Sequence, residues 1–228
     1  ASETSGSSPS RASGGAPAVQ FDADLASQYN FRGIPNNARG VLQADMVVSL
    51  PTKRATGNLD AKVWGNLDLS DDVGDAWFPD GHAGEFSQVD FHLVYSDSVK
   101  GFDLAIGLVD YLLQNPDDFP FATERGETKE VFVQAARLVA WDLYPFLAVH
   151  YDYDEVEGFY LNGGISRAFP LREKWVLETT VALGYSDEDQ SDWNYGVMES
   201  GLADLRATGA VSYQFDRHAT LRASVNGS

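Results

Sequence analysis

The chain contains no cysteine among its 228 residues, so it has neither a disulfide framework nor a thiolate that could ligate a metal or act as a nucleophile. It also lacks any apolar run near the roughly 18 residues that a membrane-spanning helix needs. A membrane β-barrel is not excluded, because each of its strands needs only about 9–11 residues, half of which can be polar. The lack of cysteine is compatible with an oxidising cell envelope, where a stray thiol is a liability.

Positive charge is scarce: 16 Lys and Arg residues stand against 34 Asp and Glu residues, for a formal net charge of −18. A chain this acidic repels nucleic acid, so we exclude nucleic-acid binding. Residues 1–18 are mostly Ser, Gly, Ala and Pro, and we expect them to form a disordered tail before a domain at 19–228. No signal-peptide pattern precedes this tail, so an exported protein would have lost its signal peptide already.

Apolar and polar residues alternate from Val19 onward, which is typical of strands with one apolar and one polar face. In the first segment, for example, Phe21 and Leu25 alternate with Asp22 and Asp24. The pattern predicts 11 strands. They cover Val19–Phe31, Leu42–Leu50, Leu59–Leu69, Gln88–Tyr95, Phe102–Leu108, Lys129–Trp141, Leu147–Tyr153, Phe159–Ile165, Trp175–Tyr185, Leu205–Phe215 and Ala219–Val225.

The segment Lys129–Trp141 fits the alternation least well. Val131 and Val133 share one parity, whereas Leu138 and Ala140 share the other. A β-bulge near Ala135 would reconcile the two halves. A short helix is the competing interpretation.

Alternation alone also fits a soluble β-sandwich with an acidic binding surface, but three further features favour a transmembrane barrel. Many of the predicted strands are longer than the roughly 5–6 residues usual in soluble sheets. Aromatic residues gather near strand ends, as in the two girdles of membrane barrels. They are Tyr29, Phe31, Tyr95, Phe102, Tyr151, Tyr153, Trp175, Tyr185, Tyr213 and Phe215.

Connection length is the third feature, because short and long connections alternate along the chain. The short ones are Pro51–Asn58, Ser96–Gly101, Trp141–Leu143, Ala168–Lys174 and Asp216–His218. The long ones are Ser70–Gly84, Gln114–Thr128 and Ser186–Gly201, while Gly33–Gly40 and Asp154–Gly158 occupy long-loop positions but are modest in length. Most of the loop carboxylates fall on the long side, whereas the short side is mildly basic. It carries Lys53, Arg54, Lys100, Arg172, Lys174 and Arg217. Short periplasmic turns opposite longer outer loops are the rule in outer-membrane barrels. The predicted fold is therefore all-β, an up-and-down antiparallel transmembrane barrel of about 11–12 strands in a bacterial outer membrane.

The residues Ser27-Gln28-Tyr29-Asn30-Phe31-Arg32-Gly33-Ile34 resemble a first-strand motif, S-D-Y-x-F-R-G-[IV], with Gln28 in place of Asp. This motif belongs to a family of uncharacterised proteobacterial outer-membrane proteins predicted to be porin-like barrels. Asp152–Tyr160 and Gly184–Asp189 are also similar to that family, so the resemblance covers the chain from about Val19 onward. It implies an outer-membrane barrel, and it implies no substrate and no catalytic residues.

If the apolar faces meet lipid, the polar parity lines a lumen. The expected lumen-lining residues are Asp22, Asp24, Asp45, Asp60, Lys62, Asp68, Asp90, His92, Asp103, His150, Asp152, Glu178, Asp204, Arg206 and Arg222. The surplus of acids predicts that small cations would pass more readily than anions. The alternative is that these charges pair across a narrow interior and fill it.

Other chemistry finds little support. Of the four histidines, we expect His82 in a loop, His218 in a tight turn, and His92 and His150 at mid-strand. No G-x-S-x-G motif occurs. We therefore predict no enzymatic activity and no cofactor. The oxygen ligands Asp187, Asp189 and Asp192 form a weak Ca²⁺ candidate, because they lack the glycine and terminal Glu of an EF-hand loop; a solvated loop is the simpler interpretation.

The expected partners are outer-membrane lipid and lipopolysaccharide. A homo-oligomer or another envelope protein could bind the outer loops, where Trp77, Phe78, Phe119, Phe121, Trp193 and Tyr195 either contact a partner or fold inward. Eleven strands also predict an open edge beside Val19–Phe31, because single-chain bacterial barrels almost always have an even strand count. The sequence therefore predicts that a final loop and a twelfth strand are missing. The alternatives are that a partner chain supplies the strand, or that the strand count is wrong around Lys129–Trp141.

Overall fold

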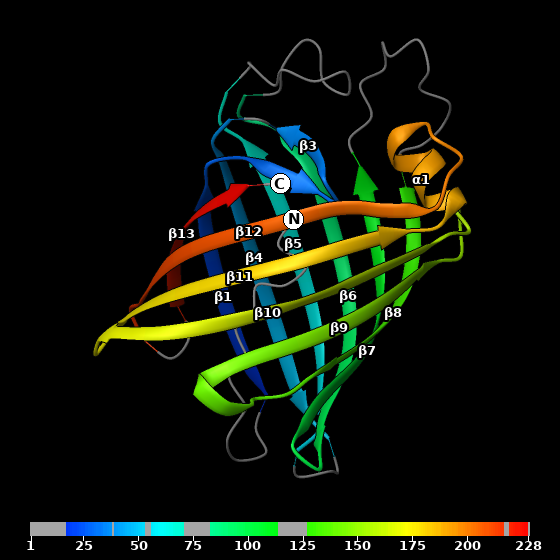
Figure 1. Cartoon of the computed structure of the whole chain (residues 1–228). Helices are drawn as coiled ribbons and strands as arrows, with labels where there is room; N and C mark the ends of the chain where they lie inside the picture. The colour runs from blue at the N-terminus through cyan, green and yellow to red at the C-terminus, as the bar shows by residue number, and fades with distance from the viewer. Residues whose placement is uncertain are drawn as a thin grey trace.

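Eleven strands of the computed structural model close into a barrel, which confirms the all-β prediction (Figure 1). The structure describes residues 17–37, 39–52, 56–70, 83–113, 127–216 and 219–227. The barrel strands are β1 (Ala18–Ala26), β4 (Val41–Pro51), β5 (Asn58–Asp68), β6 (Phe86–Val99), β7 (Phe102–Leu113), β8 (Glu127–Ala136), β9 (Leu143–Asp152), β10 (Phe159–Arg172), β11 (Trp175–Ser186), β12 (Gly201–Gln214) and β13 (Ala219–Gly227). The remaining elements are β2 (Tyr29–Phe31), β3 (Ile34–Asn37), the 3₁₀ turn η1 (Ala140–Asp142) and α1 (Glu188–Tyr195).

The two ends of the sheet pair directly with each other. Every other neighbouring pair in the barrel is antiparallel, but β1 and β13 are parallel, with Asp24 opposite Arg222. An odd number of strands leaves the first and the last running in the same direction, so only a parallel pair can close this sheet. The predicted open edge is therefore wrong, because an even count is not the only way to satisfy the edge groups.

The two faces of the barrel have opposite character. Large apolar side chains point outward and are exposed, as at Val181 (55%) and Leu205 (58%). The opposite parity carries buried polar side chains, including the fully buried Asp68 and Asn162. A protein that folds in water places these groups the other way round. The alternation of apolar and polar residues therefore predicts correctly which side chains point out of the barrel.

The connections divide between two rims. The short-turn rim carries the connections β4–β5, β6–β7, β8–β9, β10–β11 and β12–β13, whereas the long-loop rim carries the others together with α1 and the β2–β3 hairpin (Figure 1). Two of the short connections are tighter than expected, because β6 runs to Val99 and β10 to Arg172. Lys100 and Gly101 form a two-residue turn with φ of 53° and 80°, the backbone that matches the twist of a hairpin.

The ambiguous segment after Lys129 resolves differently from either prediction. β8 pairs with β7 and β9 without a register shift and ends at Ala136, so no bulge forms near Ala135. Leu138 and Ala140 belong to the following turn, which explains their change of parity. The only helical structure in this segment is the three-residue turn η1, within which Trp141 has a φ of 63°.

Aromatic rings fill part of the interior by lying over glycines of neighbouring strands. A methyl group at Gly107 would come within 2.5 Å of the Phe132 ring, and one at Gly164 within 2.8 Å of the Phe146 ring. Such close approach is possible only where no Cβ is present. These rings therefore take up part of the space that the strands enclose.

The only α-helix among the described residues is α1, and it spans eight residues. No helix in the described ranges is both long enough and apolar enough to cross a membrane.

Candidate functional site at the long-loop mouth

The first strand does not continue to Phe31 as predicted. β1 ends at Ala26, and the chain then turns inward to form a separate two-stranded sheet of β2 and β3, which we call the inner hairpin. Its turn is made by Arg32 and Gly33, with φ of 48° and 86°. A Cβ at Gly33 would lie 2.8 Å from the Asp204 Cβ, so both the backbone angle and the close approach favour glycine there.

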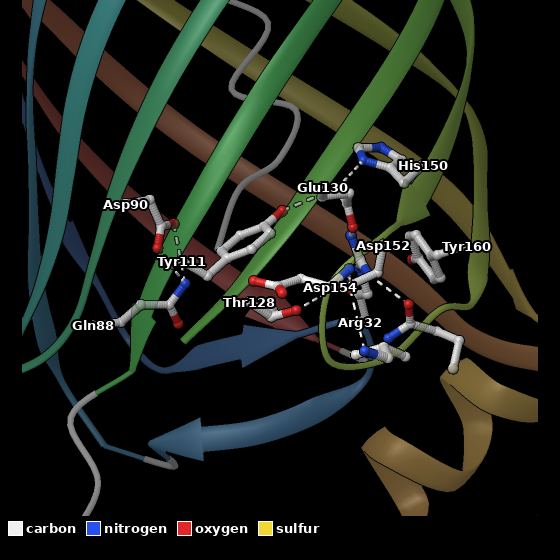
Figure 2. Close-up of polar contacts among 12 residues, drawn as sticks. Arg32, Gln88, Asp90, Tyr111, Thr128, Glu130, His150, Asp152, Asp154 and Tyr160 are labelled. Atoms are coloured by element: carbon white, nitrogen blue, oxygen red, sulfur yellow. Dashed lines mark hydrogen bonds and ion pairs between the residues drawn. The ribbon is translucent and has the colours of Figure 1, made fainter. Parts of the chain in front are cut away.

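Arg32, at the tip of the inner hairpin, is 2% exposed, and the hairpin's contacts to the barrel centre on it. Its guanidinium forms an ion pair with Glu130 of β8 (Figure 2). It also donates a 3.1 Å hydrogen bond to Oε1 of Gln190 in α1. The same group lies 4.5 Å from the centroid of the Tyr160 ring in β10. A planar guanidinium can make bidentate, ionic and ring contacts at once, which lysine cannot.

Glu130 is fully buried, and its carboxylate has three polar partners. Besides Arg32, the Tyr111 hydroxyl donates to Oε1 over 3.2 Å, and the Nδ1 atom of His150 lies 2.6 Å from the same oxygen (Figure 2). The His150 ring also stacks on Phe132, with 5.4 Å between centroids. A buried carboxylate needs this many partners, because desolvation would otherwise exceed the attraction of one cation.

The network continues to β12 through Tyr160. The Tyr160 hydroxyl donates to the Asp204 carboxylate over 2.7 Å and accepts a hydrogen bond from Arg206 over 3.1 Å. Arg206 and Asp204 are themselves within 2.8 Å of each other. Asp204 is the residue that Gly33 approaches, so the tip of the inner hairpin abuts an ion pair of the barrel wall.

The base of the inner hairpin contacts the opposite wall. Tyr29 is 1% exposed, its ring lies 5.7 Å from that of Trp64 in β5, and its hydroxyl donates to Gln88 in β6. Gln88 in turn donates to Asp90 over 2.8 Å (Figure 2). The hairpin therefore bridges the mouth from β5 and β6 to β10 and β12. The assignment of Tyr29 to an outer aromatic girdle is wrong for this reason.

Helix α1 covers the inner hairpin from outside. Its N-cap is Asp187, whose carboxylate accepts hydrogen bonds from the backbone N–H groups of Gln190 (3.0 Å) and Phe159 (2.8 Å). At its other end the Tyr195 hydroxyl donates to the backbone carbonyl of Arg32. Partial burial raises the pKa of Tyr195 to about 12, so the hydroxyl keeps the proton that it donates.

The weak Ca²⁺ candidate formed by Asp187, Asp189 and Asp192 therefore lies at the start of a helix, and the alternative of a solvated loop is wrong. The carboxylate of Asp187 is used in capping, while Asp189 and Asp192 are on the exposed surface of α1. Among the described residues, no three His, Cys, Asp or Glu side chains are grouped closely enough to hold a metal ion. The loop residues Trp77, Phe78, Phe119 and Phe121, and the histidines His82 and His218, lie outside the described residues.

The predicted lumen residues fall into two layers. Those near the long-loop rim are buried: Asp68, Asp90, His150, Asp152 and Asp204. Those further toward the short-turn rim are mostly partly exposed: Asp22, Asp24, Asp45, Lys62, His92, Glu178, Arg206 and Arg222, together with the more buried Asp60. Asp103 is exposed at the short-turn rim, where it accepts a 2.8 Å hydrogen bond from Tyr144. The layer under the inner hairpin is therefore filled, and the layer below it is more accessible.

Three of the predicted residues meet beside the parallel seam. Arg222 of β13 lies 3.4 Å from Asp24 of β1 and 3.5 Å from Glu178 of β11. Above them lies a cavity of about 30 Å³ whose walls include Gln28, Gln43, Thr180, Arg206 and Thr208. A volume of this size holds about two water molecules. It is a polar gap between the inner hairpin and the wall.

Sequence reasoning missed the centre of the site. Glu130 lies in the segment whose parity is ambiguous and is absent from the predicted lumen residues, and Arg32 falls between the predicted first strand, Val19–Phe31, and the connection Gly33–Gly40. A signal for the hairpin was nevertheless present, since Arg32-Gly33 is followed by Pro35, which disfavours a central strand position. No sequence signal pairs Arg32 with Glu130, which is 98 residues away.

Comparison of the chain with models of protein families gave no match, and comparison with curated proteins gave none either.

Proposed function

We propose that this protein is a bacterial outer-membrane barrel that passes small solutes, preferentially cations, through a narrow lumen whose outer mouth is closed by the inner hairpin. The main support for this proposal is that polar side chains point into the barrel and apolar side chains point out of it, the reverse of the arrangement in a water-soluble protein. Charged groups such as Glu130 and Asp68 are buried inside, while the outward face of the strands carries exposed Leu, Val, Ile and Phe side chains. An apolar solvent around the barrel gives this arrangement a favourable free energy, and water does not.

The dimensions and the girdles support a membrane location. The barrel strands are 9–14 residues long, and about 9–11 residues are needed to cross the hydrocarbon layer. Exposed aromatic side chains lie near both rims, for example Phe159 and Tyr185 on the long-loop side, and Phe102 and Trp175 on the short-turn side. By the rule for outer-membrane barrels, the short-turn rim then faces the periplasm.

The ion pairs support a cation preference. The inward arginines are each neutralised: Arg32 by Glu130, Arg206 by Asp204, and Arg222 by Asp24 and Glu178. Among the described residues, Asp22, Asp45 and Asp60 form no ion pair within 4 Å, and the inward Lys62 offsets only one of their three charges. The lumen below the inner hairpin therefore keeps a surplus of negative charge, which attracts cations and repels anions.

Reversal potentials across planar bilayers in a KCl gradient test the proposal. We expect K⁺ to permeate several-fold more readily than Cl⁻, and we expect the double variant Asp22→Asn/Asp45→Asn to reduce that preference because it removes unpaired lumen charge. The matched control is Asp189→Asn/Asp192→Asn on exposed α1, which should leave the ratio unchanged. Anion selectivity in the wild-type protein would contradict the proposed lumen electrostatics.

A second candidate is a non-conducting structural or interaction barrel that binds a partner through its acidic, aromatic outer loops. The filled layer at the long-loop mouth favours it. The non-conducting barrel shows no current even after the inner hairpin is released, so the planar-bilayer current of Arg32→Ala separates the two candidates. Neither candidate includes catalysis.

A further inference from the structure

Most of the described cations inside the barrel and near the long-loop rim lie beside a carboxylate, whereas those near the short-turn rim do not. Arg32, Arg206, Arg222 and Lys129 each lie within 4 Å of a carboxylate. Within the described ranges, no such ion pair is formed by five cations on strand ends and turns of the opposite rim. They are Lys100, Arg137, Arg167, Arg172 and Lys174.

Three of these cations are held against outward aromatic rings. The Arg137 guanidinium lies 5.0 Å from the ring centroid of Phe102, and the Arg167 guanidinium lies 4.6 Å from that of Phe169. The Lys174 ammonium lies 6.0 Å from the Tyr213 ring, on which Trp175 also packs at 4.8 Å. These distances are within the range of cation–π attraction, which fixes the charges without neutralising them.

Arg167 is the most informative member. It has the outward parity of Ile165 and Phe169, so its side chain projects from the apolar surface of β10. Its Nε atom is buried and has no hydrogen-bond partner in the structure. A long cationic side chain on a lipid-facing surface keeps its stem in the apolar layer and extends its charge to the interface.

We propose that Arg137, Arg167 and Lys174 bind the phosphate groups of anionic phospholipids in the leaflet at the short-turn rim. This inference depends on the proposed membrane location, and it adds a lipid class and a leaflet. Aromatic rings lie at the level of the headgroups, and the unpaired cations over them lie where lipid phosphates are found. The long-loop rim, with its exposed carboxylates on α1, has the opposite charge and favours no such contact.

Spin-labelled lipids in reconstituted vesicles test the inference. The full chain is incorporated into phosphatidylcholine vesicles, and the fraction of motionally restricted label is measured for phosphatidylglycerol and for phosphatidylcholine. We expect wild-type protein to favour phosphatidylglycerol by roughly threefold at low salt, with the preference falling as ionic strength rises. Arg137→Gln/Arg167→Gln should reduce this preference by at least half, whereas the control Arg39→Gln/Lys129→Gln near the long-loop rim should not.

The outcomes separate this inference from the proposed function. A protein that does not incorporate, or that restricts neither lipid, overturns the membrane location itself. A protein that restricts both lipids equally, or whose preference survives Arg137→Gln/Arg167→Gln and disappears in the control, remains a membrane barrel but does not bind anionic lipid at this rim.

Discussion

Replacing Arg32 with alanine is expected to lower the free energy of unfolding by about 3 kcal/mol, because it leaves the buried Glu130 carboxylate without its cation. The same change removes the hydrogen bond to Gln190 and the contact with the Tyr160 ring, which hold the tip of the inner hairpin. We therefore also expect a larger ion conductance, since the hairpin fills the mouth only while it is held there. Urea unfolding followed by Trp fluorescence measures the first effect, and planar-bilayer current measures the second.

Two further variants show whether the ion pair is the cause. Arg32→Lys keeps the charge but loses the planar fork and the ring stacking, so its stability should lie between those of wild type and Arg32→Ala. Arg32→Met/Glu130→Leu removes both charges, and it should be more stable than Arg32→Met alone, because no unpaired charge stays buried. Equal stability and equal conductance of Arg32→Ala and wild type would mean that Arg32 does not hold the hairpin. Lost stability with no current in any variant would favour the non-conducting barrel.

An arginine on the outward face near the middle of a strand is expected to be strongly destabilising. Ala207→Arg, on the outward face of β12, should lower the free energy of unfolding in lipid by about 2–4 kcal/mol, because its charge would have to enter the hydrocarbon layer. Val63→Arg on β5 should behave alike. Refolding equilibria in vesicles at graded urea concentrations measure the effect.

The controls for this experiment occupy the same and the adjacent position. Ala207→Leu should be tolerated, since the side chain remains apolar, and Thr208→Gln should cost little because Thr208 borders the polar cavity inside. Parity alone also marks Asn66 as a tolerant inward site, but Asn66 is fully buried and bonded to Gln43, Asp68 and Ser87. Equal losses at Ala207 and Thr208 would argue against lipid around the barrel.

The alternation of apolar and polar residues within each strand was enough to predict most of the fold. Each strand reports its two faces through a repeat of two, so Asp24, Asp90, Asp204 and Arg222 could be placed inside without any knowledge of their neighbours. The lengths of the connections identified the two rims. Each hairpin connection is a local segment, so its length can be read from the sequence without knowledge of the tertiary structure. Helix α1 was missed, since its exposed residues show no apolar stripe and only the Asp187 cap marks its start.

The sequence by itself determined that the chain forms eleven amphipathic strands whose polar faces lie on one side of the sheet, because the apolar–polar pattern repeats every second residue. It also determined that the connections between the strands alternate between two rims. Only the tertiary structure decided that the chain leaves β1 at Ala26, that β1 and β13 close the sheet in parallel, and that Arg32 meets Glu130. These features depend on strand count, barrel curvature and contacts between residues far apart in the chain. No local sequence pattern predicts an ion pair between an arginine in a two-residue turn and a glutamate on β8. The pair forms only when the barrel has closed and brought the two residues together.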